Sequence, residues 1–475
     1  MADPTDRQAT IAPTASQASA GPTGPAEAVP QPGPGADPGA GADLGRRRFF
    51  RQFAGDLANT AATVVGAAQA LQRTSAEMAA AILDPARVAL DERADSSAVA
   101  IAVPDQATGP VFRTSFQVEP GGIRFVDQRA LPAAVVEHVS ISAAEVVWAI
   151  RNEVVVGGPA IGQAAAIGLA LTAARAAPSL PYARRATLRG AANALKNSSP
   201  TIASLGWAVD RVMAAYERVG DLDDDGQMIA AAIQAEADAI VAEATVEHGQ
   251  LVEVGLALLD GLATTPEEPL RLLVHGPSGT LAGGQFGTAL AIAIAAHHAE
   301  REVRVVVPEG RPGLVGARIS CWELAAAGVP YVLVPDAAAA GIVASGGVDA
   351  VLVPADRVAV NGDVAAPSGS YGLAAAASER GIPFVVCVTA GSLDPTIADG
   401  SGLETGTRDV PELARIVDAA HAPRSTDVLA PIEDVVPAVL ASDDVSATGR
   451  RRPPFESVAS RWPASRSPAA ALMAP

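Results

Sequence analysis

Cysteine is almost missing from this chain, which has only Cys321 and Cys387 among its 475 residues. Both lie inside apolar segments. A disulfide framework needs pairs of cysteines, and a thiolate zinc site needs several of them at close spacing. The sequence therefore predicts neither, and it shows no other metal-binding cluster and no cofactor motif. Cys321 is predicted to be a packed core thiol, whereas Cys387, near the end of an apolar strand, could approach a site.

Positive charge is also scarce, since 34 Lys and Arg face 52 Asp and Glu, for a formal net charge of −18. Binding to a phosphate backbone needs a basic surface, so nucleic acid is not a predicted partner. No segment has the pattern of a transmembrane helix. The alanine-rich runs at residues 164–177 and 289–296 predict tightly packed helices, because alanine is a good helix former but only mildly apolar.

Apolar periodicity is missing at both ends. Residues 1–45 consist almost entirely of Ala, Pro, Gly, Thr, Gln and Asp, and residues 443–475 combine prolines and serines with Arg450 to Arg452. Such segments cannot bury enough surface to offset their ordering entropy, so both are predicted to be disordered tails. Between them we expect an α/β protein, with a small, mainly helical domain at residues 96–260 and a Rossmann-like parallel-sheet domain at residues 261–442.

Residues 46–95 precede the helical domain and begin with RRRFFRQFA. The segment from Arg46 to Leu71 resembles a twin-arginine export signal. It also fits a basic amphipathic helix that docks on a membrane surface or a partner protein. A cytoplasmic location is the primary prediction, because the segment before the arginines is long and acidic and polar residues interrupt the apolar run.

The ordered part of the sequence changes its period near residue 260. A strand pair is predicted at residues 112–126, turned at Pro120 to Gly122, and helical periodicity dominates from residue 142 to 260. Five apolar runs then alternate with helical stretches: RLLVHG, VRVVVP, YVLVPD, AVLVPAD and FVVCVT. Such runs are typical of parallel strands covered on both faces, and ligands bind at the carboxyl ends of these strands. His275, Glu309, Asp336 and Asp356 occupy such ends.

The segment from Leu272 to Leu290, LLVHGPSGTLAGGQFGTAL, predicts a strand, a tight glycine loop and a helix in succession. The loop would direct backbone N–H groups and a helix N-terminus at one place, which suits a phosphate or another oxyanion. It lacks the spacing of a dinucleotide fingerprint and the lysine of a P-loop.

Five further segments, two before this loop and three after it, belong to the same pattern. They are FVDQRALP from Phe125, VVVGGPAIGQAAAIGLAL from Val154, EGRPGLVGARISCWELAAAGVP from Glu309, VDAVLVPADRVAVNGDV from Val348 and GSYGLAAAASERGIPFVV from Gly369. In this order and spacing, residues 112–440 resemble the methylthioribose-1-phosphate isomerase family. That family also includes ribose bisphosphate isomerases and the regulatory subunits of a eukaryotic exchange factor for translation initiation.

The resemblance implies a site in which a cysteine and an aspartate move hydrogen between the first two carbons of a phosphorylated sugar. Asp356, in PADR, matches the aspartate, and burial would raise its pKa toward a general-acid role; the alternative is a helix cap or a partner for Arg357. His275, which titrates near neutrality, is the candidate for a second catalytic group. The implied substrate-binding residues are Gly157, Gly158, Ser278, Gly279, Thr280, Glu309, Arg311 and Asn361.

The sequence departs from the family at several of its chemical groups. Gly276 stands at the position of the cysteine, and Val156 and Ser199 replace two arginines that would grip phosphate with charge-assisted hydrogen bonds. The remaining departures are Pro277, Val315, Ala366 and Pro367. Matching residues such as Trp322 and Glu323 are interpreted as supports of the fold.

Two functions follow from this combination. One is the aldose–ketose isomerisation of a phosphorylated pentose, as the resemblance implies. The alternative is a regulatory protein that senses a sugar phosphate or nucleotide without converting it, like the exchange-factor subunits. The predicted partner is a small phosphorylated sugar or related metabolite, and the resemblance implies a homodimer.

Overall fold

The computed structural model describes residues 114–451 apart from 221–225, 263–267, 300, 408–422, 424 and 425. The predictions for residues 1–45 and 46–95, including the segment from Arg46 to Leu71, lie outside this part of the chain. Among the residues described, no helix has the length and apolar character that crossing a membrane requires.

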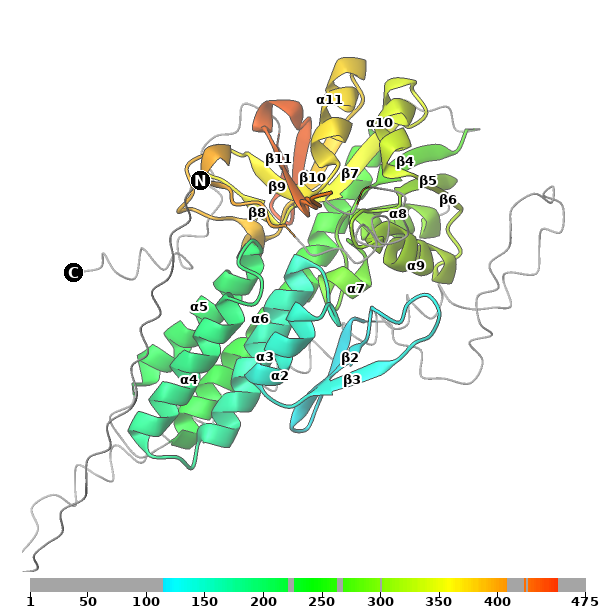
Figure 1. Cartoon of the computed structure of the whole chain (residues 1–475). Coiled ribbons are helices and arrows are strands. Elements are labelled where there is room, and N and C mark those ends of the chain that lie inside the picture. The colour runs from blue at the N-terminus through cyan, green and yellow to red at the C-terminus, as the bar shows by residue number, and fades with distance from the viewer. Residues whose placement is uncertain are drawn as a thin grey trace, which may run out of the picture. The chain divides into compact units, whose positions relative to one another are not determined.

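The first part is a helical bundle of α2 (Ala143–Arg151), α3 (Gly158–Ala176), α4 (Pro181–Lys196), α5 (Ala203–Val219) and α6 (Gly226–Asp260). Figure 1 shows α3 between its neighbours, and nearly every residue of α3 is buried. Its alanines and glycines permit this, because small side chains let neighbouring backbones approach closely. At Gly162, for example, a Cβ would lie 2.7 Å from the Ser204 carbonyl oxygen of α5.

A three-stranded antiparallel sheet lies beside the bundle and consists of β1 (Phe116–Glu119), β2 (Gly122–Val126) and β3 (Glu137–Ser140). The predicted strand pair is therefore confirmed, and its turn falls at Gly121. The third strand was not predicted, because its four residues, EHVS, carry little apolar alternation.

The second part is built on a seven-stranded sheet whose order is β13-β12-β10-β7-β4-β5-β6. The five predicted apolar strands all form: β4 (Leu270–Val274), β5 (Val303–Pro308), β6 (Tyr331–Val334), β7 (Ala350–Pro354) and β10 (Phe384–Cys387). Each pairs in parallel with its neighbours. The helices α8 (Ala289–His298), α9 (Cys321–Ala326), α10 (Asp336–Ala344) and α11 (Ser370–Arg380) surround it (Figure 1). The predicted fold class is thus confirmed.

The sheet continues beyond residue 442, where the sequence predicted a disordered tail. β12 (Asp443–Ser446) pairs in parallel with β10, and β13 (Gly449–Arg451) returns antiparallel to it. The boundary at 443 was wrong because the strand DDVS looks polar. Asp443 is nevertheless buried, and the Arg450 guanidinium of the next strand forms an ion pair with its carboxylate.

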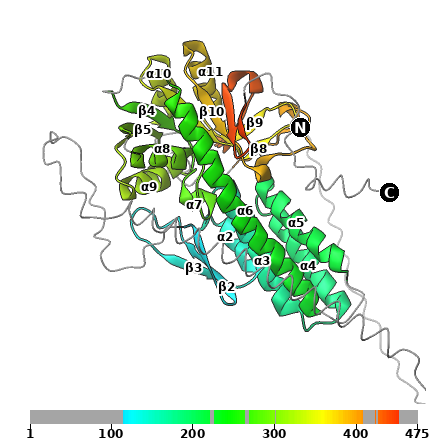
Figure 2. The ribbon, with the colours of Figure 1, turned by 180° about the vertical axis from the view of Figure 1, so that it is seen from behind.

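Helix α6 ends at Asp260, where the sequence predicts the domain boundary, but its last turns already pack with the sheet. Figure 2 shows it running from the bundle toward the sheet. Its last turns bury Leu251, Leu258 and Leu259 in the same apolar core as β4 and β5. A small sheet of β8 (Arg357–Val358), β9 (Val364–Pro367) and β11 (Glu433–Val436) completes this part. The bundle and the sheet therefore share one long helix beside the carboxyl ends of the strands.

Candidate functional site

The carboxyl ends of β4, β7 and β10 meet the first turn of α3 at one small cavity. Residues from these four segments and from α7 (Thr280–Gly283) line it: Gly158, Pro159, Pro277, Ser278, Ala282, Gly283, Thr288, Pro354, Ala355, Asp356, Cys387 and Thr389. Its volume of about 10 Å³ holds roughly one water molecule. The predicted residues Gly158, Ser278 and Asp356 are brought together here, but in a closed arrangement.

Asp356 follows β7 and contributes the carboxyl group of the cavity. Its side chain faces the first turn of α3, where a Cβ on Gly158 would lie 3.8 Å from Oδ1. Burial raises the pKa of Asp356 to about 7, and the nearby Glu433 carboxylate acts in the same direction. At neutral pH a large fraction of Asp356 therefore carries a proton, as a general acid requires.

Gly276 stands directly beside this cavity and has no room for a side chain. Its φ is +86°, and a Cβ would lie 2.5 Å from Cγ of Pro367. Both the backbone conformation and the neighbouring ring therefore require glycine. The position at which the family resemblance implies a cysteine is filled by the Pro367 ring.

The Glu323 side chain of α9 packs against the glycine loop that follows β4. The Leu281 N–H donates to Oε1 of Glu323 at 3.0 Å, and a Cβ on Gly279 would lie 2.3 Å from the same carboxylate. Burial raises the pKa of Glu323 to about 7, against the opposing effect of the Leu281 and Thr280 N–H groups. The Glu323 carboxyl group therefore accepts hydrogen bonds from the Thr280 and Leu281 N–H groups, which the sequence predicts to bind an oxyanion. From the sequence, Glu323 is interpreted only as a support of the fold or dimer.

His275 does not line the cavity. Its Nε2 lies 2.9 Å from the Ser368 carbonyl oxygen, which can only accept, so Nε2 carries the hydrogen. Burial lowers the pKa of His275, and Nδ1 has no hydrogen-bond partner among the described residues. The imidazole is therefore neutral and directed toward the first turn of α11.

Four other residues predicted to bind substrate, Glu309, Arg311, Asn361 and Gly157, lie outside the cavity lining. The Gly310 and Arg311 N–H groups donate to Asp336, and Arg311 forms a weak pair with Glu309 at 3.4 Å. Asn361 makes reciprocal hydrogen bonds with Asp363 in the β8–β9 turn. Gly157, with φ of +94°, packs on Ala282 behind the cavity wall.

Comparison with known proteins identifies the family of this chain. The profile of the initiation factor 2 subunit family matches residues 154–450. The chain belongs to this family. The methylthioribose-1-phosphate isomerase of Gemmatimonas aurantiaca is 38% identical over 333 residues, which are 70% of this chain and 92% of the relative. That of a Synechococcus strain is 36% identical over 333 residues, which are 70% and 93%. The resemblance inferred from the motifs is confirmed.

Two solved structures have folds similar to that of this chain. The 5-methylthioribose 1-phosphate isomerase of Pyrococcus horikoshii OT3 has a TM-score of 0.63 and 30% identity, over 73% of this chain and 94% of that one. The delta subunit of the translation initiation factor eIF-2B from A. fulgidus has a TM-score of 0.60 and 26% identity, over 72% and 97%. An isomerase and a translation initiation factor subunit thus have folds similar to that of this chain.

Among the described residues that line the cavity of this family member, none is an arginine or lysine. Arg357, adjacent to Asp356, is held by the loop before α5, because it donates to the carbonyls of Pro200 and Thr201 and pairs with Asp394 at 2.8 Å. Cys387 does reach the cavity, but burial and the Asp444 charge raise its pKa far above the ordinary value. Its thiol is therefore a poor source of thiolate at neutral pH.

Proposed function

We propose that this chain is a methylthioribose-1-phosphate isomerase-like protein that senses a phosphorylated sugar or related metabolite and does not isomerise it. Gly276 carries the proposal. A glycine that Pro367 prevents from holding any side chain cannot exchange protons, so one of the two groups implied for the reaction is missing. Val156 and Ser199 in place of two arginines weaken the grip on phosphate in addition.

A second candidate function is isomerisation with Asp356 as the remaining proton-transfer group and His275 as its assistant. The pKa of Asp356 near 7 favours it, because a carboxyl poised near the working pH transfers protons efficiently. The Ser368 carbonyl on Nε2 of His275 argues against it, because the imidazole would have to turn before it could act.

An NMR time course with methylthioribose-1-phosphate separates the two functions. We expect no conversion by the purified chain, while the Gemmatimonas aurantiaca relative converts the compound in the same assay. Protein resonances of the cavity are expected to shift on binding. Conversion that disappears in Asp356→Asn would contradict the sensor and establish an isomerase.

We further propose that the chain is a homodimer that pairs through β6, the edge strand of the large sheet. Tyr331, Val332 and Leu333 are 39%, 40% and 47% exposed, so an apolar edge is left uncovered within the described chain. Uncovered edges of this kind invite pairing with a second sheet.

Sedimentation velocity checks the oligomeric state. We expect the wild type to sediment as a dimer and Leu333→Glu as a monomer, because a charge on the edge would be buried without a partner. Val439→Glu, at a 78% exposed valine in another part of the fold, is the matched control and should remain dimeric. A monomeric wild type would refute the pairing.

A further inference from the structure

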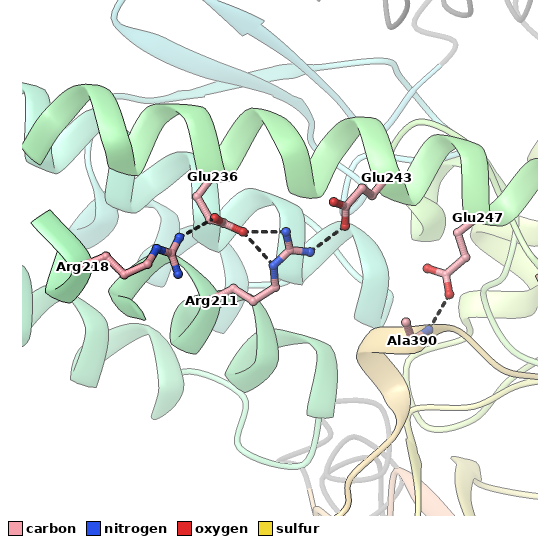
Figure 3. Close-up of polar contacts among 6 residues, drawn as sticks. All are labelled: Arg211, Arg218, Glu236, Glu243, Glu247 and Ala390. Carbon is pink, nitrogen blue, oxygen red and sulfur yellow. Dashed lines mark hydrogen bonds and ion pairs between the residues drawn. The ribbon is translucent and has the colours of Figure 1, made fainter. Parts of the chain in front are cut away.

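The wall of the cavity that follows β10 is held by a side chain from the helical bundle. Thr389 lines this wall and is the N-cap of the short 3-10 helix η3 (Ala390–Ser392), which follows it. Oε1 of Glu247 on α6 accepts a hydrogen bond from the Ala390 N–H at 2.5 Å, a short contact of the charge-assisted kind (Figure 3).

Several other polar groups of this turn form hydrogen bonds within it. The Thr389 N–H donates to Oγ of Ser392 at 3.2 Å, and that hydroxyl donates back to the Thr389 carbonyl at 2.8 Å. The capping box fixes the shape of the turn but does not attach it to the bundle. The Glu247 contact supplies a polar attachment to α6.

Apolar packing presses the same turn against α5. A Cβ on Gly391 would lie 3.1 Å from Cβ of Ser204 and 3.3 Å from the Trp207 ring. The Arg211 guanidinium lies over that ring at 5.0 Å and pairs with Glu236 and Glu243 of α6 (Figure 3). Trp207 therefore packs on η3 with one part of its ring and lies beside the Arg211 ion pairs with another.

The residue after Glu247 holds another wall in a similar way. Nδ1 of His248 lies 3.1 Å from the Phe286 carbonyl oxygen and must donate to it, since a carbonyl only accepts. Burial lowers the pKa of His248 to about 4, so the ring stays neutral. Phe286 lies between Gly283 and Thr288, which both line the cavity. Two adjacent side chains of α6 thus anchor two of the loops that enclose Asp356.

We propose that Glu247 is a positioning residue of the Asp356 site, which keeps the cavity closed by holding η3 through the Ala390 N–H. The proposal rests on the proposed function in one respect, that the Asp356 cavity is the ligand site. When this contact is lost, η3 moves away from α6, and the half-buried Asp356 residue gains more access to water.

The test follows the titration of the Asp356 carboxyl carbon by ¹³C NMR in the whole chain. Glu247→Asp keeps the charge but is one methylene too short for the Ala390 N–H. We expect the midpoint of Asp356 to fall by about one pH unit or more, because hydration removes the main cause of its elevation. Glu247→Gln still accepts the hydrogen bond and should titrate like the wild type.

Glu243→Gln is the matched control, because Glu243 lies one turn earlier on α6 and contacts Arg211 instead of η3. Its Asp356 midpoint should stay unchanged even if the protein loses stability. Glu433, the charged neighbour of Asp356, is present in every variant. An unchanged midpoint in Glu247→Asp, or equal shifts in the Asp and Gln variants, would overturn the proposal. Turnover of methylthioribose-1-phosphate by the wild type would refute the sensor function but leave this result intact.

Discussion

Replacing Gly276 by alanine is expected to lower the free energy of unfolding by about 2–5 kcal/mol. A left-handed backbone costs a residue with a Cβ roughly 1–2 kcal/mol, and forcing a methyl group against a packed ring adds about 1–3 kcal/mol. The φ of +86° and the 2.5 Å approach to Pro367 place Gly276 under both penalties. Gly276→Cys should be at least as destabilising. Urea unfolding followed by circular dichroism measures the loss.

Gly190→Ala is the matched control. Gly190 lies on the exposed side of α4, where a Cβ would meet nothing within 4 Å. Alanine there should leave stability unchanged or raise it by up to about 1 kcal/mol, because it is the better helix former. Adding Pro367→Ala to Gly276→Ala should restore the part of the free energy of unfolding that is lost through crowding against the Pro367 ring. A Gly276→Ala protein as stable as the wild type would show that neither the backbone conformation nor Pro367 excludes a side chain at this position.

The sheet and the place of the candidate site in the fold were predictable because both depend on patterns that the chain repeats. Five apolar runs define parallel strands, and the carboxyl ends of such strands bind ligands. Asp356 and Ser278 follow from that rule. The rule does not predict the direction in which the His275 side chain points, although this direction also depends on the strand. Side chains alternate along a strand, so His275 shares the face of Leu273, which packs with α11 rather than α8. The sequence shows the alternation but not which helix covers which face.

Other features depended on contacts between distant segments. β12 was missed because the burial of Asp443 is compensated by Arg450, a pair that apolar patterning does not reveal. The loss of a cysteine at Gly276 was visible in the sequence. The role of Pro367 was not, because only the fold brings β9 against the loop after β4. Glu247 gave no signal at all, since a glutamate on a helix is usually solvated.

Glu323→Gln is expected to stabilise the protein above neutral pH by on the order of 2 kcal/mol. Glu323 is 7% exposed, and burial raises its pKa to about 7. The unfolded chain releases this proton near pH 4, so between about pH 4 and 7 the native state binds more protons than the unfolded state. The contribution of Glu323 to stability is therefore complete below pH 4 and is lost as the pH rises through 7. Glutamine stays neutral and can still accept the Leu281 N–H.

Unfolding curves at pH 4.5 and pH 8 measure this effect as a difference between variant and wild type. The difference is needed because His248 and His275 also change the stability with pH, and in the opposite direction. Burial lowers their pKa values, so the stability that they contribute is lost as the pH falls below about 6.5. These contributions are the same in variant and wild type and cancel in the difference. Near pH 4.5 Glu323→Gln should resemble the wild type. Glu217→Gln, at an exposed position on α5, is the control and should match the wild type at both pH values.

Asp356→Asn should show the same pH dependence as Glu323→Gln, because burial also raises the pKa of Asp356 to about 7. The two effects should add, since the carboxyls contact different loops. If Glu323→Gln instead destabilises the protein at pH 8, then Glu323 is ionised in the folded state and its charge stabilises the Thr280 and Leu281 N–H groups. The glycine loop would then already hold its anion, and a phosphate could bind there only by displacing a carboxylate of the chain itself.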